Sequence, residues 1–334
     1  MKQVFSILLL LILFLYVPSI IVAQSFSIEL GPKQQEIITQ RNKTITIPYT
    51  ITNYADPQVL NLSIYTLSVL DNEGNYDLTP YKNDDTGIHF KILGNTVALD
   101  SPFLLKSKNT LDFNLEITIP AEIQETDYTF SLVAQIEPQK GFENTNTILL
   151  QGGIASNIIL SVTDSGNLDQ KGNIIQYEFL TDKILNWGNK KIALLNSYQE
   201  IPVLLMASNN GNNAVKTSGS ITLLSNNKEK RIERASFTIP PQYIFAGSQR
   251  LLKTSDTYCE NNLNSVCKKT HSVVIKSPFM GLYNVAAVVS FGENAQISYN
   301  TITFLVLPIT YLSIFLIFII VFLIFLPTLR RYIK

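Results

Sequence analysis

The chain has 334 residues, and its 26 Lys and Arg balance its 26 Asp and Glu, so the formal net charge is zero. All 26 acidic residues lie between Glu29 and Glu293. The same region contains only 22 basic residues, so its net charge is −4. An acidic middle excludes the basic surface that nucleic-acid binding requires, so no nucleic-acid partner is expected.

The N-terminal end has the parts of an export signal. Lys2 gives a small positive start, Ile7 to Tyr16 is an apolar core of about ten residues, and Ala23 supplies a small residue for cleavage. Residues 1–23 are therefore predicted to be a signal peptide. An uncleaved anchor is the alternative, and both interpretations place the middle of the chain outside the cell.

The C-terminal end predicts a membrane anchor. Residues Phe304 to Leu326 carry no charge, and about 20 apolar residues suffice to cross a bilayer. The last residues, 327–334, contain Arg330, Arg331 and Lys334, and basic residues flanking a span stay in the cytoplasm. We therefore expect a single-pass cell-membrane protein, integral in the membrane, with its ectodomain outside and its C-terminus cytoplasmic.

The middle of the chain alternates with a period of two. Apolar side chains fall on every second position from Leu111 to Ile119, and again from Tyr128 to Ile136. One buried and one wet face is typical of antiparallel sheet, and turn-rich runs separate the strands. The sequence predicts an all-β fold of two tandem antiparallel, immunoglobulin-like β-sandwich domains, at 25–163 and 174–303, on either side of a polar segment.

The two cysteines, Cys259 and Cys267, are separated by seven residues in YCENNLNSVC. Disulfides persist in exported segments, so we expect the pair to close one small loop. A metal site is the alternative, but two Cys without a nearby His make half a zinc site at best.

Catalysis is poorly supported, and we predict that the chain is not an enzyme. His89 lies in an alternating strand and His271 lies beside the cysteine loop, while no nucleophile elbow, HExxH motif or P-loop occurs. The adjacent Asp84 and Asp85 lack the facing geometry of glycosidase carboxylates. No cofactor is expected.

One loop carries oxygen ligands at alternate positions around Gly74. Such spacing can wrap Ca²⁺, although a β-turn with solvated acids is the preferred interpretation, so no metal site is predicted. We treat this loop, and the neighbouring Tyr81 to Gly87, as candidate binding loops at the end of the first domain farthest from the membrane. The residues of the first loop are Asp71, Glu73, Asn75 and Asp77.

Five segments of the two domains have a recognisable order. The first domain has ITNYADPQVLNLSIYTLSVLDNEGNY (Ile51 to Tyr76) and LKSKNTLDFNLEITIP (Leu105 to Pro120). The second has IPVLLMASNNGNNAVKTSGSITLL (Ile201 to Leu224), IFAGSQR (Ile244 to Arg250) and GLYNVAAVVSFGENAQISYNTITFLVLP (Gly281 to Pro308). With the predicted signal and anchor, this order resembles that of the WxL-interacting proteins of bacterial cell surfaces, and the resemblance covers nearly the whole chain. The family implies an outer domain associated with peptidoglycan and a second domain that contacts other proteins. Its binding residues do not carry over one by one.

Two functional hypotheses follow. The preferred one is a membrane-anchored, non-enzymatic cell-surface binding or scaffold protein that contacts cell-wall glycan or other surface or secreted proteins. The alternative is an accessory ectodomain subunit of a membrane complex for export or surface assembly.

Overall fold

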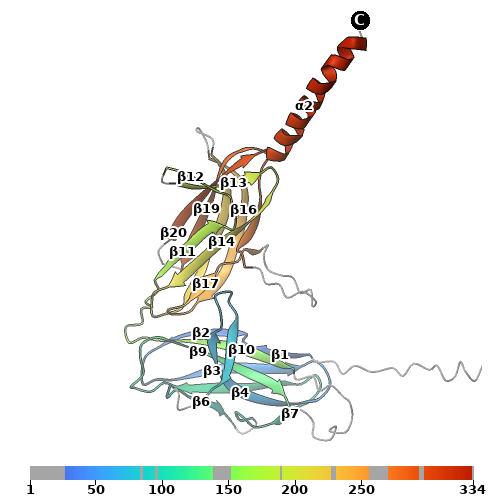
Figure 1. Ribbon diagram of the computed structural model, residues 1–334. Helices are drawn as coiled ribbons and strands as arrows, with labels where there is room; N and C mark the ends of the chain where they lie inside the picture. The colour runs from blue at the N-terminus through green and yellow to red at the C-terminus, as the bar shows by residue number, and fades with distance from the viewer. Residues whose placement is uncertain are drawn as a thin grey trace, which may run out of the picture.

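The computed structural model describes residues 27–82, 86–94, 97–137, 152–188, 190–226, 231–255, 270–292 and 297–332 (Figure 1). The predicted signal peptide, Cys259 and Cys267, Asp84 and Asp85, and Lys334 lie outside these residues.

The N-terminal sandwich (β1 to β10) is built from two sheets. One has the strand order β1 (Ile28–Gly31), β3 (Thr44–Asn53), β8 (Thr110–Thr118), β6 (His89–Leu93). The other has the order β2 (Gln34–Thr39), β10 (Gly153–Val162), β9 (Asp127–Ile136), β4 (Gln58–Val69), β5 (Tyr76–Pro80), with β7 (Phe103–Leu105) also paired to β4. The alternating residues predicted to face inward do so, and Leu115 and Ile117 of β8 are fully buried.

Aromatic rings fill the centre of this core. Tyr49 stacks on Phe113 across paired strands, with ring centroids 5.6 Å apart. Phe90 meets Phe130 edge-on at 4.9 Å and so joins the two sheets. Full burial of a side chain of this size stabilises the fold by about 1.5–3 kcal/mol.

The C-terminal sandwich (β11 to β20) repeats the two-sheet arrangement. One sheet has the order β11 (Gly172–Phe179), β14 (Glu200–Asn209), β17 (Gln249–Leu251), with β18 (Val273–Lys276) also paired to β14. The other has the order β12 (Ile184–Trp187), β13 (Lys190–Asn196), β20 (Ile297–Leu307), β19 (Gly281–Phe291), β15 (Val215–Asn226), β16 (Arg231–Ile244).

Both sandwiches share one feature that the alternating pattern does not predict. An early strand crosses to the sheet of the last strand and pairs with it in parallel: β2 with β10, and β13 with β20. The other strand pairs are antiparallel. This arrangement is immunoglobulin-like, and it confirms the all-β sandwich class.

The predicted membrane span is wrong. Its first residues, Phe304 to Leu307, belong to β20 and pair with β13 and β19. Phe304 and Val306 are fully buried, and Phe304 meets Phe179 edge-on at 5.4 Å in the core. The apolar run is therefore divided between a strand and a helix.

The helix that follows Pro308, α2 (Ile309–Tyr332), includes Arg330 and Arg331 in its last turn, so these residues do not form a separate tail. Within the described part of the chain, no helix combines the length and apolarity that crossing a membrane requires. This finding overturns the single-pass localisation expected from the sequence.

Candidate functional site

The candidate Ca²⁺ loop forms the tip of the hairpin between β4 and β5. The Oδ1 of Asp71 accepts hydrogen bonds from the backbone N–H of Glu73 at 2.8 Å and of Asn75 at 3.2 Å, and its Oδ2 accepts from Asn75 Nδ2 at 2.7 Å. The Asn75 side chain is the main reason that the pKa of Asp71 lies below its usual value. The carboxylate shapes the turn, because its oxygens already have donors.

A second acid among the candidate ligands has a local role as well. Asp77 Oδ1 accepts a hydrogen bond from the backbone N–H of Leu78 at 3.0 Å. Among the described residues, no three His, Cys, Asp or Glu side chains gather as a metal site would require. His89 is exposed on β6 of one sandwich and His271 precedes β18 of the other, so the fold does not bring the histidines together.

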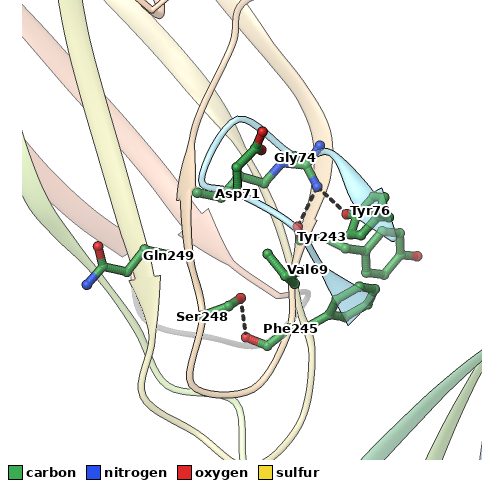
Figure 2. Close-up of a pocket in the computed structure, with 9 residues that line it drawn as sticks. Val69, Asp71, Gly74, Tyr76, Tyr243, Phe245, Ser248 and Gln249 are labelled. Atoms are coloured by element: carbon green, nitrogen blue, oxygen red, sulfur yellow. Dashed lines mark hydrogen bonds between the residues drawn. The ribbon is translucent and has the colours of Figure 1, made fainter. Parts of the chain in front are cut away.

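The hairpin tip does not point away from the second sandwich but touches it. The backbone N–H of Leu251 on β17 donates to the carbonyl of Asn72 at 2.7 Å. Figure 2 shows the hairpin lying against the end of β16 and the turn that leads to β17. The loop singled out from the sequence is thus part of the contact between the sandwiches, which we call the junction.

Arg250 of β17 is the central side chain of the junction. Its Nη1 donates to the hydroxyl of Tyr76 on β5 and to the carbonyl of Tyr243 on β16, both at 2.7 Å (Figure 2). The ring of Tyr76 also lies 5.5 Å from that of Phe245, centroid to centroid. One arginine therefore binds both sandwiches at once.

Gly74 makes this close approach possible. Its φ is +91°, a conformation that residues with a Cβ rarely adopt, and an added Cβ would collide with Nη2 of Arg250. The guanidinium thus packs directly on the hairpin backbone. The Nε of Arg250 is buried without a hydrogen-bond partner, so the side chain depends on its Nη1 contacts.

The hollow around Arg250 is too small for an ordinary ligand. Even with the open solvent at its mouth included, its empty volume is about 190 Å³, whereas small-molecule pockets usually enclose roughly 300–1,000 Å³. The geometry supports a structural contact at this position rather than a substrate pocket.

A second contact joins β9 to the C-terminal sandwich. The carboxylate of Asp127 accepts from Asn213 Nδ2 at 2.8 Å and from the backbone N–H of Ala214. Asn213 in turn accepts from the backbone N–H of Asp169 at 2.8 Å, and Asp169 lies in the linker, the segment between β10 and β11. The neighbouring Thr126 hydroxyl donates to the carbonyl of Asn212 at 3.0 Å.

A third contact rests on Glu36 of β2. Its carboxylate accepts from the hydroxyl of Tyr243 and lies 3.5 Å from the Nζ of Lys216. Lys216 stands over the Tyr243 ring, 5.3 Å from its centroid. Burial raises the pKa of Tyr243 and the Glu36 bond raises it further, while the hydrogen bond to Tyr243 raises the pKa of Lys216.

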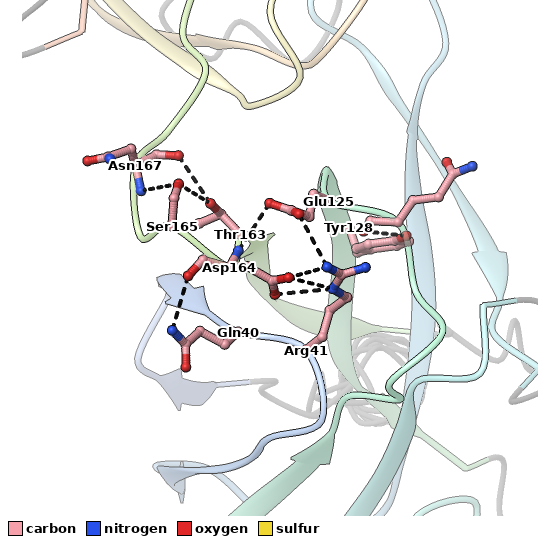
Figure 3. Close-up of polar contacts among 9 residues, drawn as sticks. Gln40, Arg41, Glu125, Tyr128, Thr163, Asp164, Ser165 and Asn167 are labelled. Carbon is pink, nitrogen blue, oxygen red and sulfur yellow. Dashed lines mark hydrogen bonds and ion pairs between the residues drawn. The ribbon is translucent and has the colours of Figure 1, made fainter.

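Hydrogen bonds also tie the start of the linker to the N-terminal sandwich (Figure 3). Arg41 Nε donates to both carboxylate oxygens of Asp164, at 3.1 and 3.0 Å, and the backbone N–H of Asp164 donates to Glu125 Oε2 at 3.1 Å. Gln40 Nε2 donates to the Asp164 carbonyl at 3.1 Å. The hydrogen bonds from Arg41 lower the pKa of Asp164, and the same pairing raises the pKa of Arg41.

These contacts place one end of the C-terminal sandwich against β2 and the start of β9 (Figure 1). Val133 and Ile159, which face away from the N-terminal core, are 6% and 5% exposed. These two side chains are therefore buried although they do not belong to the N-terminal core.

No family model matches the sequence, and the comparison with characterised proteins finds no match. Among solved structures, similarity is found to fimbrial chaperones. The class 5 fimbriae chaperone CfaA is 9% identical over 83% of this chain and 99% of that chain, with a TM-score of 0.39. The E. coli chaperone DraB is 12% identical over 83% and 99%, with a TM-score of 0.35. The Pseudomonas aeruginosa chaperone CupB2 is 8% identical over 82% and 98%, with a TM-score of 0.33. At these TM-scores we draw nothing about function from them.

Sequence reasoning missed most of the junction. Arg250 lies in the segment IFAGSQR and Asn213 in the Asn/Gly-rich run 209–213, but no local signal pairs them with Tyr76 and Asp127.

Proposed function

We propose that the chain is a non-enzymatic scaffold that binds another protein across its two sandwiches. The observation that carries this proposal is the junction, in which Arg250, Asp127 and Glu36 each link one sandwich to the other. Linked domains move relative to each other by default unless a large apolar interface joins them, and we propose that the polar contacts of the junction, with the packing of Tyr76 on Phe245, restrain that motion here. A fixed angle favours a partner that touches both sandwiches at once.

A protein partner is favoured by the strands that expose apolar side chains. Leu104 on β7, Ile38 on β2 and Ile184 on β12 are 60%, 56% and 50% exposed. Such positions at sheet margins are where an extended segment of another chain adds to a sheet. The partner class that the resemblance to WxL-interacting proteins implies, a secreted or surface protein, agrees with this chemistry.

Cross-linking capture tests the proposal. The intact chain is purified, cross-linked in an envelope extract of its own cells, and the captured protein is identified, purified and titrated back. We expect one protein partner whose capture is lost when the extract is first digested with protease. If the captured partner belongs to an export or assembly complex, the result favours the alternative hypothesis, in which the chain is an accessory subunit of such a complex.

The glycan hypothesis is tested in parallel by co-sedimentation with purified, protein-free wall glycan. Binding to that glycan together with failure to capture any protein would contradict the proposal. A well-folded chain that binds neither would contradict it as well.

A further inference from the structure

Strand β12 is an edge strand whose outer side has no partner strand among the described residues. It ends the sheet order β12–β13–β20–β19–β15–β16, so only β13 pairs with it among the described residues. At the opposite end of this sheet, β16 contains Pro240 and Pro241, which cannot donate backbone hydrogen bonds and so discourage pairing. The described part of β12 has no proline.

The register shows which backbone groups of β12 are free. Leu194 N–H donates to the carbonyl of Lys183 at 2.8 Å, so this pair is a hydrogen-bonded one. Hydrogen-bonded and non-hydrogen-bonded pairs alternate in antiparallel sheet, and Asn186 is opposite Lys191 in a non-hydrogen-bonded pair. The N–H and C=O of Asn186 and the C=O of Ile184 therefore point outward, away from β13.

Apolar side chains are available on both faces of the strand. Ile184 and Leu185 point to opposite faces and are 50% and 44% exposed. An added strand would cover both of them while its backbone paired with Asn186.

The charges beside β12 define the chemistry of the added strand. The side chains of Lys183 and Lys191 are exposed, and the acidic Asp182 directly precedes Lys183 in the sequence. Lys191 lies directly across from Asn186. The local excess of positive charge favours a segment with carboxylates beside its apolar residues.

We propose that the free edge of β12 binds an extended, acidic-flanked segment of a partner protein as an additional strand of the β12–β16 sheet. This inference rests on the proposed protein-binding function and assigns it a surface. The backbone of Asn186 supplies the paired donor and acceptor, Ile184 and Leu185 supply the apolar contact, and Lys183 and Lys191 select for acidic residues.

The test uses the intact chain and three fluorescent ten-residue peptides of alternating Val and Thr: one with Glu at both ends, one with Lys at both ends, and the Glu-ended one with a central proline. Anisotropy should show that the Glu-ended peptide binds at least fivefold more tightly than the other two. Hydrogen exchange of the Asn186 amide should slow at least tenfold when that peptide is bound.

Asn186→Pro removes the outward N–H without touching the bonds to β13, and it should weaken binding at least fivefold. Asn186→Thr, which keeps the N–H, should bind as the unchanged chain does. Equal affinity of Asn186→Pro and the unchanged chain, equal binding of Lys-ended and Glu-ended peptides, or pairing of β12 with a second copy of this chain would overturn the assignment. A captured partner that binds Asn186→Pro with undiminished affinity would overturn the β12 site but leave the protein-binding function standing.

Discussion

Arg250 in the C-terminal sandwich donates from Nη1 to the hydroxyl of Tyr76 in the N-terminal sandwich at 2.7 Å. The two residues are 174 positions apart in the chain, and the same nitrogen also bonds the carbonyl of Tyr243. Hydrogen bonds to charged groups are stronger than neutral ones. This pair therefore couples the placement of the hairpin to that of the second sandwich.

Gly74→Ala should open the junction. The new Cβ would collide with the Arg250 guanidinium, and the positive φ adds backbone strain of about 1–3 kcal/mol. We expect faster hydrogen exchange at the Leu251 amide, which donates to Asn72. Gly94→Ala is the matched control, because Gly94 also has a positive φ but has nothing within 4 Å of an added Cβ. Equal exchange at Leu251 in both variants would argue against the contact.

Tyr76→Phe should weaken the junction while keeping its aromatic contact. The ring can still pack on Phe245, but Arg250 loses one acceptor, at a cost of about 1.5 kcal/mol in the free energy of opening. Native-state hydrogen exchange at Leu251 measures that free energy. No change would mean that the hydroxyl contributes nothing across the junction.

Phe304→Ala should destabilise the C-terminal sandwich strongly. The ring is fully buried, so its removal should cost about 3–5 kcal/mol in the free energy of unfolding, measured by urea titration. Phe279→Ala, at a site that is 47% exposed, is the control and should cost less than about 1 kcal/mol. Similar small losses at both sites would indicate that residue 304 does not lie in a core strand.

Arg41→Gln should change the titration of Asp164. The pKa of Asp164 lies below its ordinary value because of Arg41. The contact therefore stabilises the fold at pH values above the ordinary aspartate pKa of about 3.9. That contribution is lost as the pH falls through the lowered, folded-state pKa. Carboxyl ¹³C NMR should show the pKa of Asp164 rising toward its ordinary value in the variant and staying low in Arg41→Lys, which keeps the charge.

The strands could be predicted because their signal is local. Alternation from Leu111 to Ile119 matches β8 closely, since a half-buried strand must present every second side chain to the core. The membrane span was mispredicted because hydropathy cannot separate a buried strand end from an apolar helix. Pro308, between β20 and α2, is the one local sign of the change.

The junction could not be predicted, because its pairs are distant in sequence and use ordinary turn residues. The sequence marks Asp71 as a possible Ca²⁺ ligand because its carboxylate offers oxygen atoms. In the structure, Asn75 donates a hydrogen bond to that carboxylate within the turn, and this bond decides its role. Gly74 stands in a turn-like run, and the structure adds two reasons against a side chain there: the positive φ and the guanidinium of Arg250.

The most direct test of the account is the affinity of the captured partner for the unchanged chain, for Gly74→Ala and for Gly94→Ala, measured by calorimetric titration. If the partner spans two sandwiches held at a fixed angle, Gly74→Ala should bind at least tenfold more weakly, while Gly94→Ala should bind like the unchanged chain. Equal affinity of all three proteins would contradict the claim that the junction holds both sandwiches in place for one partner.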